Sequence, residues 1–174
     1  MKVLVLTGPE SSGKSWLANA IQATFGGILV DEYVRHFIDS EARDTCYADI
    51  PVIAIGQLAW EDDARAKQPS LLILDTHLLS NMLWSRTLFG DCPAWLEDAL
   101  LTRHYDLHLL LSPESIAWHD DGQRCQPELS ERLAFFQATH AWLTRHQQPY
   151  QVVQGDWDQR MRAAFEAVTR LLDD

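Results

Sequence analysis

The sequence predicts an α/β fold, a three-layer sandwich in which a sheet of five parallel strands lies between two layers of helices. Five short apolar runs recur along the chain, at Val3–Leu6, Ile28–Val30, Leu71–Leu74, Leu107–Leu111 and Tyr150–Val153. Each run is apolar at successive positions, which is typical of a strand that is covered on both faces. The stretches between the runs have helical spacing, and helices are the usual crossovers between parallel strands.

The helices are predicted from apolar spacing and from the residues that start and stop helices. The first is expected to end at Gly26-Gly27, and the second has Pro51 in its first turn, where proline is tolerated. A longer segment after Pro127 has apolar positions that step by three and four. The predicted helices are Lys14–Thr24, Ile50–Arg65, Leu78–Leu88, Ala94–Arg103, Glu128–His146 and Gln159–Leu172.

Length and charge narrow the class of protein. A chain of 174 residues, without an internal repeat or a linker-like stretch, is expected to form a single domain over residues 1–174. With 14 basic and 25 acidic residues the net charge is −11, which argues against nucleic acid as a partner. Three scattered cysteines indicate neither a disulfide framework nor a zinc site, and no apolar run is long enough for a signal peptide or a membrane span. We expect a cytoplasmic protein without a membrane partner.

A glycine-rich segment carries the clearest chemistry. Residues Gly8–Ser15 read Gly-Pro-Glu-Ser-Ser-Gly-Lys-Ser, which fits G-x-x-x-x-G-K-[ST], and they follow the first strand and open the first helix. In such a phosphate loop the backbone N–H groups wrap a diphosphate, Lys14 reaches the β- and γ-phosphates, and the Ser15 hydroxyl ligates Mg²⁺. The sequence therefore predicts a P-loop NTPase fold that binds ATP and Mg²⁺. The ATP-binding residues expected in this loop are Gly8, Glu10, Ser11, Ser12, Gly13, Lys14 and Ser15.

Two acids follow the second strand, where ligands bind in open parallel sheets. Asp31 or Glu32 is a candidate general base that deprotonates an acceptor hydroxyl, and Arg35 is a candidate cation for the substrate. Alternatively, the acids belong to the first turn of a helix and are stabilised by its dipole.

Asp75 ends the third strand, in the position of a Walker-B carboxylate that holds Mg²⁺. Alternatively, Asp75 with Thr76 caps the following helix. Residues 114–132 are interpreted as a lid, with Arg124 as the first candidate to stabilise transition-state charge on the phosphates and Arg132 as the second. The alternative for Arg124 is an exposed arginine in an acidic loop.

Taken together, the motifs resemble the ribosylnicotinamide kinase domain of the NadR family, a group of phosphate-loop small-molecule kinases. The resemblance implies ATP-dependent phosphorylation of the 5′-hydroxyl of nicotinamide riboside to nicotinamide mononucleotide, and a sheet with strand order 2-3-1-4-5. The segments that carry it are Gly8–Ser15, Asp31–Arg35, Tyr47–Ile50 with Ala54–Gln57 and Glu61, Leu74–Thr76 and Asp120–Arg124.

The resemblance also assigns roles to residues. It places Lys14 and Ser15 on ATP and Mg²⁺, Asp75 on the metal, Glu32 on the substrate or as base, and Arg124 in the lid. The residues expected to contact the substrate are Glu32, Arg35, Tyr47, Asp49, Gln57, Asp75, Trp84 and Asp120. A pyridinium riboside is cationic, so carboxylates such as Asp49 and Asp120 suit it, as does a stacking Trp84 or Trp118. Alternatively, any one of these tryptophans packs in the core or at its rim.

The sequence departs from the family in two respects. Bifunctional members carry an adenylyltransferase domain ahead of the kinase, whereas here Met1 lies two residues before the first strand, so we expect any such activity to reside elsewhere. His77 stands where the family has aspartate, so it retunes metal or acceptor contacts, acts as a base, or is a partly buried histidine at a helix start.

Two other functions remain open. One is a kinase of a different nucleoside or small acceptor, because pocket shape sets the acceptor. The other is a P-loop ATPase or nucleotide-sensing module that signals through a partner. A GTPase is disfavoured, because the sequence has no Asn-Lys-x-Asp guanine motif.

Overall fold

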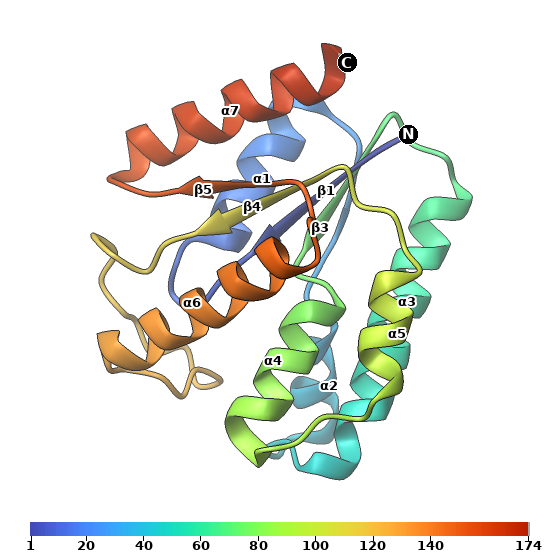
Figure 1. Cartoon of the computed structure of the whole chain (residues 1–174), viewed down its shortest axis with the longest axis vertical. Coiled ribbons are helices and arrows are strands. Elements are labelled where there is room, and N and C mark those ends of the chain that lie inside the picture. The colour runs from blue at the N-terminus through green and yellow to red at the C-terminus, as the bar shows by residue number, and fades with distance from the viewer. Residues whose placement is uncertain (174) are drawn as a thin grey trace.

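The computed structural model describes residues 1–173 and contains one five-stranded parallel sheet (Figure 1). The strands lie in the order β2-β3-β1-β4-β5, and every neighbouring pair is parallel. Both the parallel sheet and the predicted strand order are therefore confirmed. The strands are β1 Lys2–Thr7, β2 Ile28–Val30, β3 Leu71–Asp75, β4 Leu107–Leu111 and β5 Tyr150–Val153.

All six predicted helices are present, with ends that differ by at most three residues from the predicted ones. The helices within the described residues are α1 Lys14–Phe25, α2 Tyr33–Glu41, α3 Ile50–Ala66, α4 Leu78–Phe89, α5 Trp95–Leu101, α6 Leu129–Arg145 and α7 Trp157–Asp173, with a 3₁₀ turn, η1, at Tyr47–Asp49. Helix α2 is not among the predicted helix ranges; a helix start at these positions was only the alternative interpretation of Asp31 and Glu32. Val34, Phe37 and Ile38 have helical spacing, but α2 is nine residues long and buries Phe37 alone, so its apolar signal is short.

The helices form two layers, one on each face of the sheet. Successive residues of a strand point to opposite faces, so Val3 and Val5 of β1 join one apolar cluster while Leu4 and Leu6 join the other. Helices α1 and α7 cover the second cluster, and α3 to α6 supply the helical residues of the first (Figure 1). Strands β1 and β3 are buried on both sides, which explains their continuous apolar runs.

The carboxyl ends of the parallel strands meet at one edge of the sheet. Leu6 of β1 lies in register with Asp75 of β3, so the glycine-rich loop and this aspartate start from neighbouring positions. Gly8 has φ +130°, and a Cβ there would lie 2.6 Å from the carbonyl oxygen of Leu111, so only glycine lets β1 turn here. Within residues 1–173, no helix is long and apolar enough to cross a bilayer.

Candidate active site

The loop after β1 forms the floor of the site. Gly13 adopts φ +89° and its position is closed by the Trp157 ring, 2.6 Å from where a Cβ would stand, so α1 begins directly behind a glycine. Two groups of the loop donate to the Pro9 carbonyl, the Ser12 hydroxyl at 2.8 Å and the Lys14 ammonium at 2.8 Å. These contacts fold the loop around the start of α1, where backbone N–H groups and the helix dipole favour an anion.

Opposite charges converge on Lys14. Burial lowers its pKa, while the carboxylates of Glu32 and Asp75 work in the opposite direction. Burial, followed by the charge of Glu32, raises the pKa of Asp75 to about 6, and Lys14 opposes that shift. The structure thus brings Lys14, Glu32 and Asp75 together from the ends of three different strands. Titratable groups with shifted pKa values, such as Lys14 and Asp75, are typical of functional sites.

The donor set near Asp75 suits a hard divalent cation. Asp75 is buried, and its Oδ1 has no hydrogen-bond partner within residues 1–173. The hydroxyl of Ser15, at the start of α1, lies close enough to Asp75 to oppose the rise in the pKa of that carboxyl. Within residues 1–173, no group of three or more His, Cys, Asp or Glu side chains is placed so that it could hold a metal ion. Mg²⁺ commonly takes one or two protein oxygens and completes its shell with water and phosphate, so Ser15 and Asp75 fit it.

A cavity of about 630 Å³ opens beside the loop. Glu32 and Arg35 enter it from the start of α2, whereas Asp31, the other candidate base, is exposed and does not line it. Helix α4 supplies another wall, which includes Trp84. The remaining walls come from the lid, with Arg124, and from the start of α7. The cavity therefore adjoins the phosphate loop on one side and has room for a second ligand between α2 and α4.

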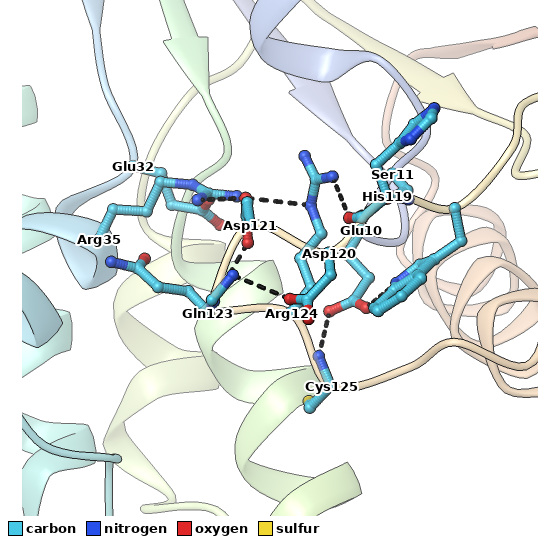
Figure 2. Close-up of polar contacts among 12 residues, drawn as sticks. Glu10, Ser11, Glu32, Arg35, His119, Asp120, Asp121, Gln123, Arg124 and Cys125 are labelled. Carbon is cyan, nitrogen blue, oxygen red and sulfur yellow. Dashed lines mark hydrogen bonds and ion pairs between the residues drawn. The ribbon is translucent and has the colours of Figure 1, made fainter.

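Glu10 attaches the lid to the phosphate loop (Figure 2). Its carboxylate accepts a hydrogen bond from the Trp118 indole at 2.8 Å and from the backbone N–H groups of Cys125 at 3.1 Å and Gln126 at 2.7 Å. A carboxylate with three donors forms strong charge-assisted hydrogen bonds. Trp118 is therefore a lid anchor, and its interpretation as a platform for the substrate is not supported by its position.

Asp121 attaches the lid to α2 on the opposite side of the cavity (Figure 2). Its carboxylate lies 2.9 Å from the Arg35 guanidinium and 3.2 Å from Nε of Arg124, so one acid bridges two arginines. Burial works to raise the pKa of Asp121, but the hydrogen bonds from Arg35 and the Gln123 backbone and the charges of Arg35 and Arg124 together outweigh it, so the pKa is lowered. Arg35 also binds Glu32 at 3.1 Å, which fixes that carboxylate at the start of α2.

Several residues expected to contact the substrate lie outside the cavity. Asp49 is buried and accepts hydrogen bonds from Arg43 at 2.7 and 2.9 Å, and this guanidinium holds the pKa of Asp49 well below its usual range. The Tyr47 hydroxyl donates to Asp91 at 3.2 Å. These side chains have protein partners and do not line the cavity, so the structure does not bring Tyr47 and Asp49 to the position expected for contact with the substrate.

Three further residues that were predicted to contact the substrate or ATP also lie outside the cavity lining. Gln57 accepts from the backbone N–H of Tyr33 at 2.9 Å and so secures the start of α2, directly after Glu32. The Asp120 carboxylate accepts from the backbone of Gly122 at 2.9 Å and shapes the lid turn. Arg132 is buried in α6 away from the cavity lining, with its Nε and one Nη unpaired within the described residues.

His77 is fully buried and does not line the cavity. Its Nε2 lies 3.2 Å from Nε2 of His108, beneath the edge of the sheet. Of the three interpretations of this residue, the structure fits the histidine at a helix start, and it is more deeply buried than expected.

The sequence analysis missed residues that reach the cavity from distant elements. Ser80 and Asn81 line it from the first turn of α4, one turn before Trp84. Trp16 and Trp157 line it beside the phosphate loop, with ring centroids 4.8 Å apart and with exposures of 45% and 43%. The helical spacing from Ser80 to Trp84 was a usable signal. The Trp16–Trp157 contact joins distant helices and leaves no local pattern.

Buried Arg160 holds the start of α7 against the loop and the lid. It donates to the carbonyls of Gly155 at 2.7 Å, Ser12 at 3.2 Å and Glu114 at 2.7 Å. A fully buried guanidinium is costly unless its donors are satisfied, and here three backbone segments satisfy it. Arg160 therefore fixes the position of Trp157 relative to the phosphate loop.

The loop at the end of β1, the aspartate at the end of β3 and the strand order define a phosphate-loop nucleotide-binding protein with the fold of small-molecule kinases. The chain belongs to the AAA domain family, whose model matches residues 3–160.

Two curated relatives confirm the resemblance to NadR. The chain is 24% identical over 177 residues to the trifunctional NAD biosynthesis/regulator protein NadR of Salmonella typhimurium, and 23% identical to that of Escherichia coli. Each alignment covers 99% of this chain and 43% of the relative, so the chain spans less than half the length of these proteins.

Solved structures share the fold. A NadR protein in complex with NR superposes with a TM-score of 0.81 at 19% identity, over 99% of this chain and 52% of that one. A NadR protein with NAD and AMP-PNP gives 0.72 at 16% identity, over 99% and 50%. Deoxyadenosine kinase from M. mycoides with bound dATP gives 0.64 at 14% identity, over 97% and 100%.

Proposed function

We propose that residues 1–174 form one kinase domain that uses MgATP to phosphorylate the 5′-hydroxyl of nicotinamide riboside, giving nicotinamide mononucleotide for NAD biosynthesis. The observation that carries the proposal is the cavity whose walls join the phosphate loop and Glu32 to the space between α2 and α4, with Asp75 buried close enough to Lys14 and Glu32 for their charges to affect one another. The likeness to NadR over 99% of this chain supports the choice of acceptor.

The donor end of the cavity is built for a triphosphate. The backbone N–H groups of the loop hold the diphosphate, and Lys14, whose ammonium is buried among carboxylates, contacts the β- and γ-phosphates. Ser15 and Asp75 would hold Mg²⁺, which neutralises charge on these phosphates when bound.

Glu32 is the candidate base at the reacting end. Its carboxylate accepts the proton as the acceptor oxygen bonds to the γ-phosphorus and the bond from that phosphorus to the ADP oxygen breaks. The hydrogen bond from Arg35 orients Glu32. Arg124, held in the lid near Arg35 by Asp121, supplies positive charge where negative charge develops on the transferred group.

The acceptor compartment suits a flat ring that carries positive charge. Trp84 offers an aromatic surface, Ile53, Leu88 and Phe89 are apolar, and Asp44 lies at the wall. An indole attracts a cation over its face, and burial strengthens the attraction. Trp84 packs on Phe135 with centroids 4.8 Å apart, so its orientation is fixed before a substrate arrives.

A kinase of another nucleoside is the second candidate, and it is favoured by the likeness of the fold to deoxyadenosine kinase. A coupled assay of ADP release separates the candidates, with nicotinamide riboside, ribonucleosides and simple sugars as acceptors. Acceleration by nicotinamide riboside above all others supports the proposal, and a preference for an ordinary nucleoside transfers the assignment to that compound. No acceleration by any riboside favours a nucleotide sensor.

The base is tested by Glu32→Gln, with Asp31→Asn as the matched control because Asp31 is the exposed neighbour. Phosphoryl transfer is expected to collapse in Glu32→Gln while ATP affinity barely changes, and Asp31→Asn is expected to keep its turnover. A nucleotide sensor would keep its function in both variants.

A further inference from the structure

We propose that Ser80 and Asn81, in the first turn of α4, bind the sugar hydroxyl groups of the acceptor and thereby select ribosides with a complete vicinal diol. The inference rests on the proposed function. Buried polar groups without hydrogen-bond partners are concentrated beside this cavity. Six of the eleven buried side-chain atoms without a hydrogen-bond partner in residues 1–173 gather at the ends of β1 and β3 and the start of α4, namely Thr7 Oγ1, Asp75 Oδ1, Thr76 Oγ1, His77 Nδ1, Ser80 Oγ and Asn81 Nδ2.

Unpaired groups of this kind call for an explanation. An unsatisfied buried donor or acceptor costs about 1–3 kcal/mol, and folded proteins keep few of them. Ser80 is only 2% exposed and lines the cavity together with Asn81, so a change of rotamer can turn each unpaired atom toward a ligand in the cavity. Ser85 on the same helix shows the ordinary situation, because it is fully buried and donates to the Asp91 carbonyl at 2.7 Å.

The position of the pair along α4 indicates which part of the acceptor it meets. Helix α4 starts three residues after Asp75, so Ser80 and Asn81 lie near the reacting end of the cavity. A helix rises about 1.5 Å per residue, which puts Trp84 roughly 6 Å and Leu88 roughly 12 Å beyond Ser80. The wall of α4 thus changes from polar to apolar with distance from the phosphate loop.

A riboside has the same polarity gradient. Its 5′-hydroxyl must reach Glu32, so its pentose lies beside Ser80 and Asn81 and its base extends to Trp84 and Leu88. A serine hydroxyl and an asparagine amide each offer a donor and an acceptor, as does each hydroxyl of a vicinal diol. The pair is therefore assigned to the 2′- and 3′-hydroxyls and not to the base.

The test is a cycle of enzyme variants and substrates. The kcat/KM of wild type, Asn81→Ala and Ser80→Ala is measured with the accepted riboside and with its 2′-deoxy and 3′-deoxy analogues. For the complete riboside we expect a loss of about 10- to 100-fold in Asn81→Ala, as for one hydrogen bond to a substrate hydroxyl. For the analogue that lacks the contacted hydroxyl, variant and wild type should differ by less than about threefold.

Ser85→Ala is the matched control. It removes a satisfied hydrogen bond on the same helix, so we expect a lower melting temperature with an unchanged ratio of riboside to deoxy analogue. Asn81→Ala removes a group that has no protein partner, so its melting temperature should equal or exceed that of wild type.

Equal losses for the riboside and both deoxy analogues, or no loss at all, would overturn the assignment while leaving riboside kinase activity intact. A second measurement tests the proposed function itself, namely calorimetry of riboside binding to the wild-type protein with a non-hydrolysable ATP analogue present. If no riboside is bound in this measurement and none is phosphorylated with ATP, both the proposed function and the assignment of Ser80 and Asn81 are wrong.

Discussion

Two buried histidines, His77 and His108, face each other under the active edge of the sheet. Nδ1 of His108 lies 2.9 Å from the Pro149 carbonyl, which can only accept, so this nitrogen carries the proton. Nε2 of neutral His108 then accepts from Nε2 of His77 at 3.2 Å. Protonation of His108 at Nε2 would set two N–H groups against each other, and protonation of His77 at Nδ1 would bury a charge without a partner, so the fold requires both rings to be neutral.

This requirement makes the stability of the fold depend on pH. Burial lowers the pKa of His108 to about 4, only partly offset by the hydrogen bond to Pro149, and burial with the neighbouring His108 lowers the pKa of His77 in the same direction. Between pH 6.5 and about 4 the unfolded chain takes up a proton at position 108 and the folded chain does not, so the free energy of unfolding falls as the pH falls. The gap for His108 corresponds to about 3 kcal/mol.

The substitution His108→Asn isolates this contribution. An asparagine amide can keep the hydrogen bond to Pro149 and does not titrate. In urea unfolding we expect the wild-type free energy of unfolding to fall by about 3 kcal/mol more than that of the variant between pH 7 and pH 4. A constant offset between the two from lost packing does not affect the comparison. His104→Asn is the control, because the side chain of His104 is 80% exposed. Parallel pH curves for wild type and His108→Asn would refute the reasoning.

Three further predictions concern the cavity. Lys14→Ala should reduce ATP turnover by about 100-fold or more without lowering the melting temperature, because a buried ammonium stabilises bound phosphate and not the fold, and ADP release and thermal melting measure both. Glu10→Gln should loosen the lid, so amide exchange at residues 118–126 should rise together with the KM for ATP; unchanged exchange would contradict the role given to this carboxylate. The exposed indole of Trp157 is expected to stack on the adenine base. Trp157→Ala should therefore weaken ATP binding, measured by calorimetry, by about tenfold or more and leave the binding of tripolyphosphate, which has no base, unchanged.

The strands and the longer helices were predictable because the pattern of apolar residues within each of these segments indicates which of its side chains are buried. A strand covered on both faces is apolar at most positions, with exceptions such as His108 in β4 and Gln151 in β5, and each of the five runs was recognised within one residue of its observed ends. Helix α2 was not predicted as an element because it is nine residues long and buries only Phe37, so its apolar spacing, at Val34, Phe37 and Ile38, spans little more than one turn. The acids before it were interpreted as a strand end, with the first turn of a helix as the alternative, and the structure places Glu32 directly before α2.

The candidate site likewise has parts that the local sequence predicts and parts that it does not. The phosphate loop is a contiguous motif, and the parallel register that puts Leu6 beside Asp75 follows from strand order, so these parts were predictable. Arg160 binds the carbonyl of Ser12 across 148 residues, and no local pattern signals such a contact. Asp49 was predicted to contact the substrate, but its carboxylate is bound by Arg43, six residues earlier in the sequence.

The charge of the cavity differs from that of the molecule as a whole, and this difference bears on how a nucleotide enters. The chain carries a net charge of −11, yet Lys14, Arg35 and Arg124 all line the cavity. Asp121, an acid of the lid segment itself, lies between the two arginines and orients them. Under the proposed function, a phosphate group that binds these arginines takes over partners that are already oriented, and it releases Asp121, which is exposed at the surface, to water. Exchange of one anion for another avoids the cost of gathering the arginines anew, so Asp121 prearranges the positive charges that the transition state needs instead of competing with them.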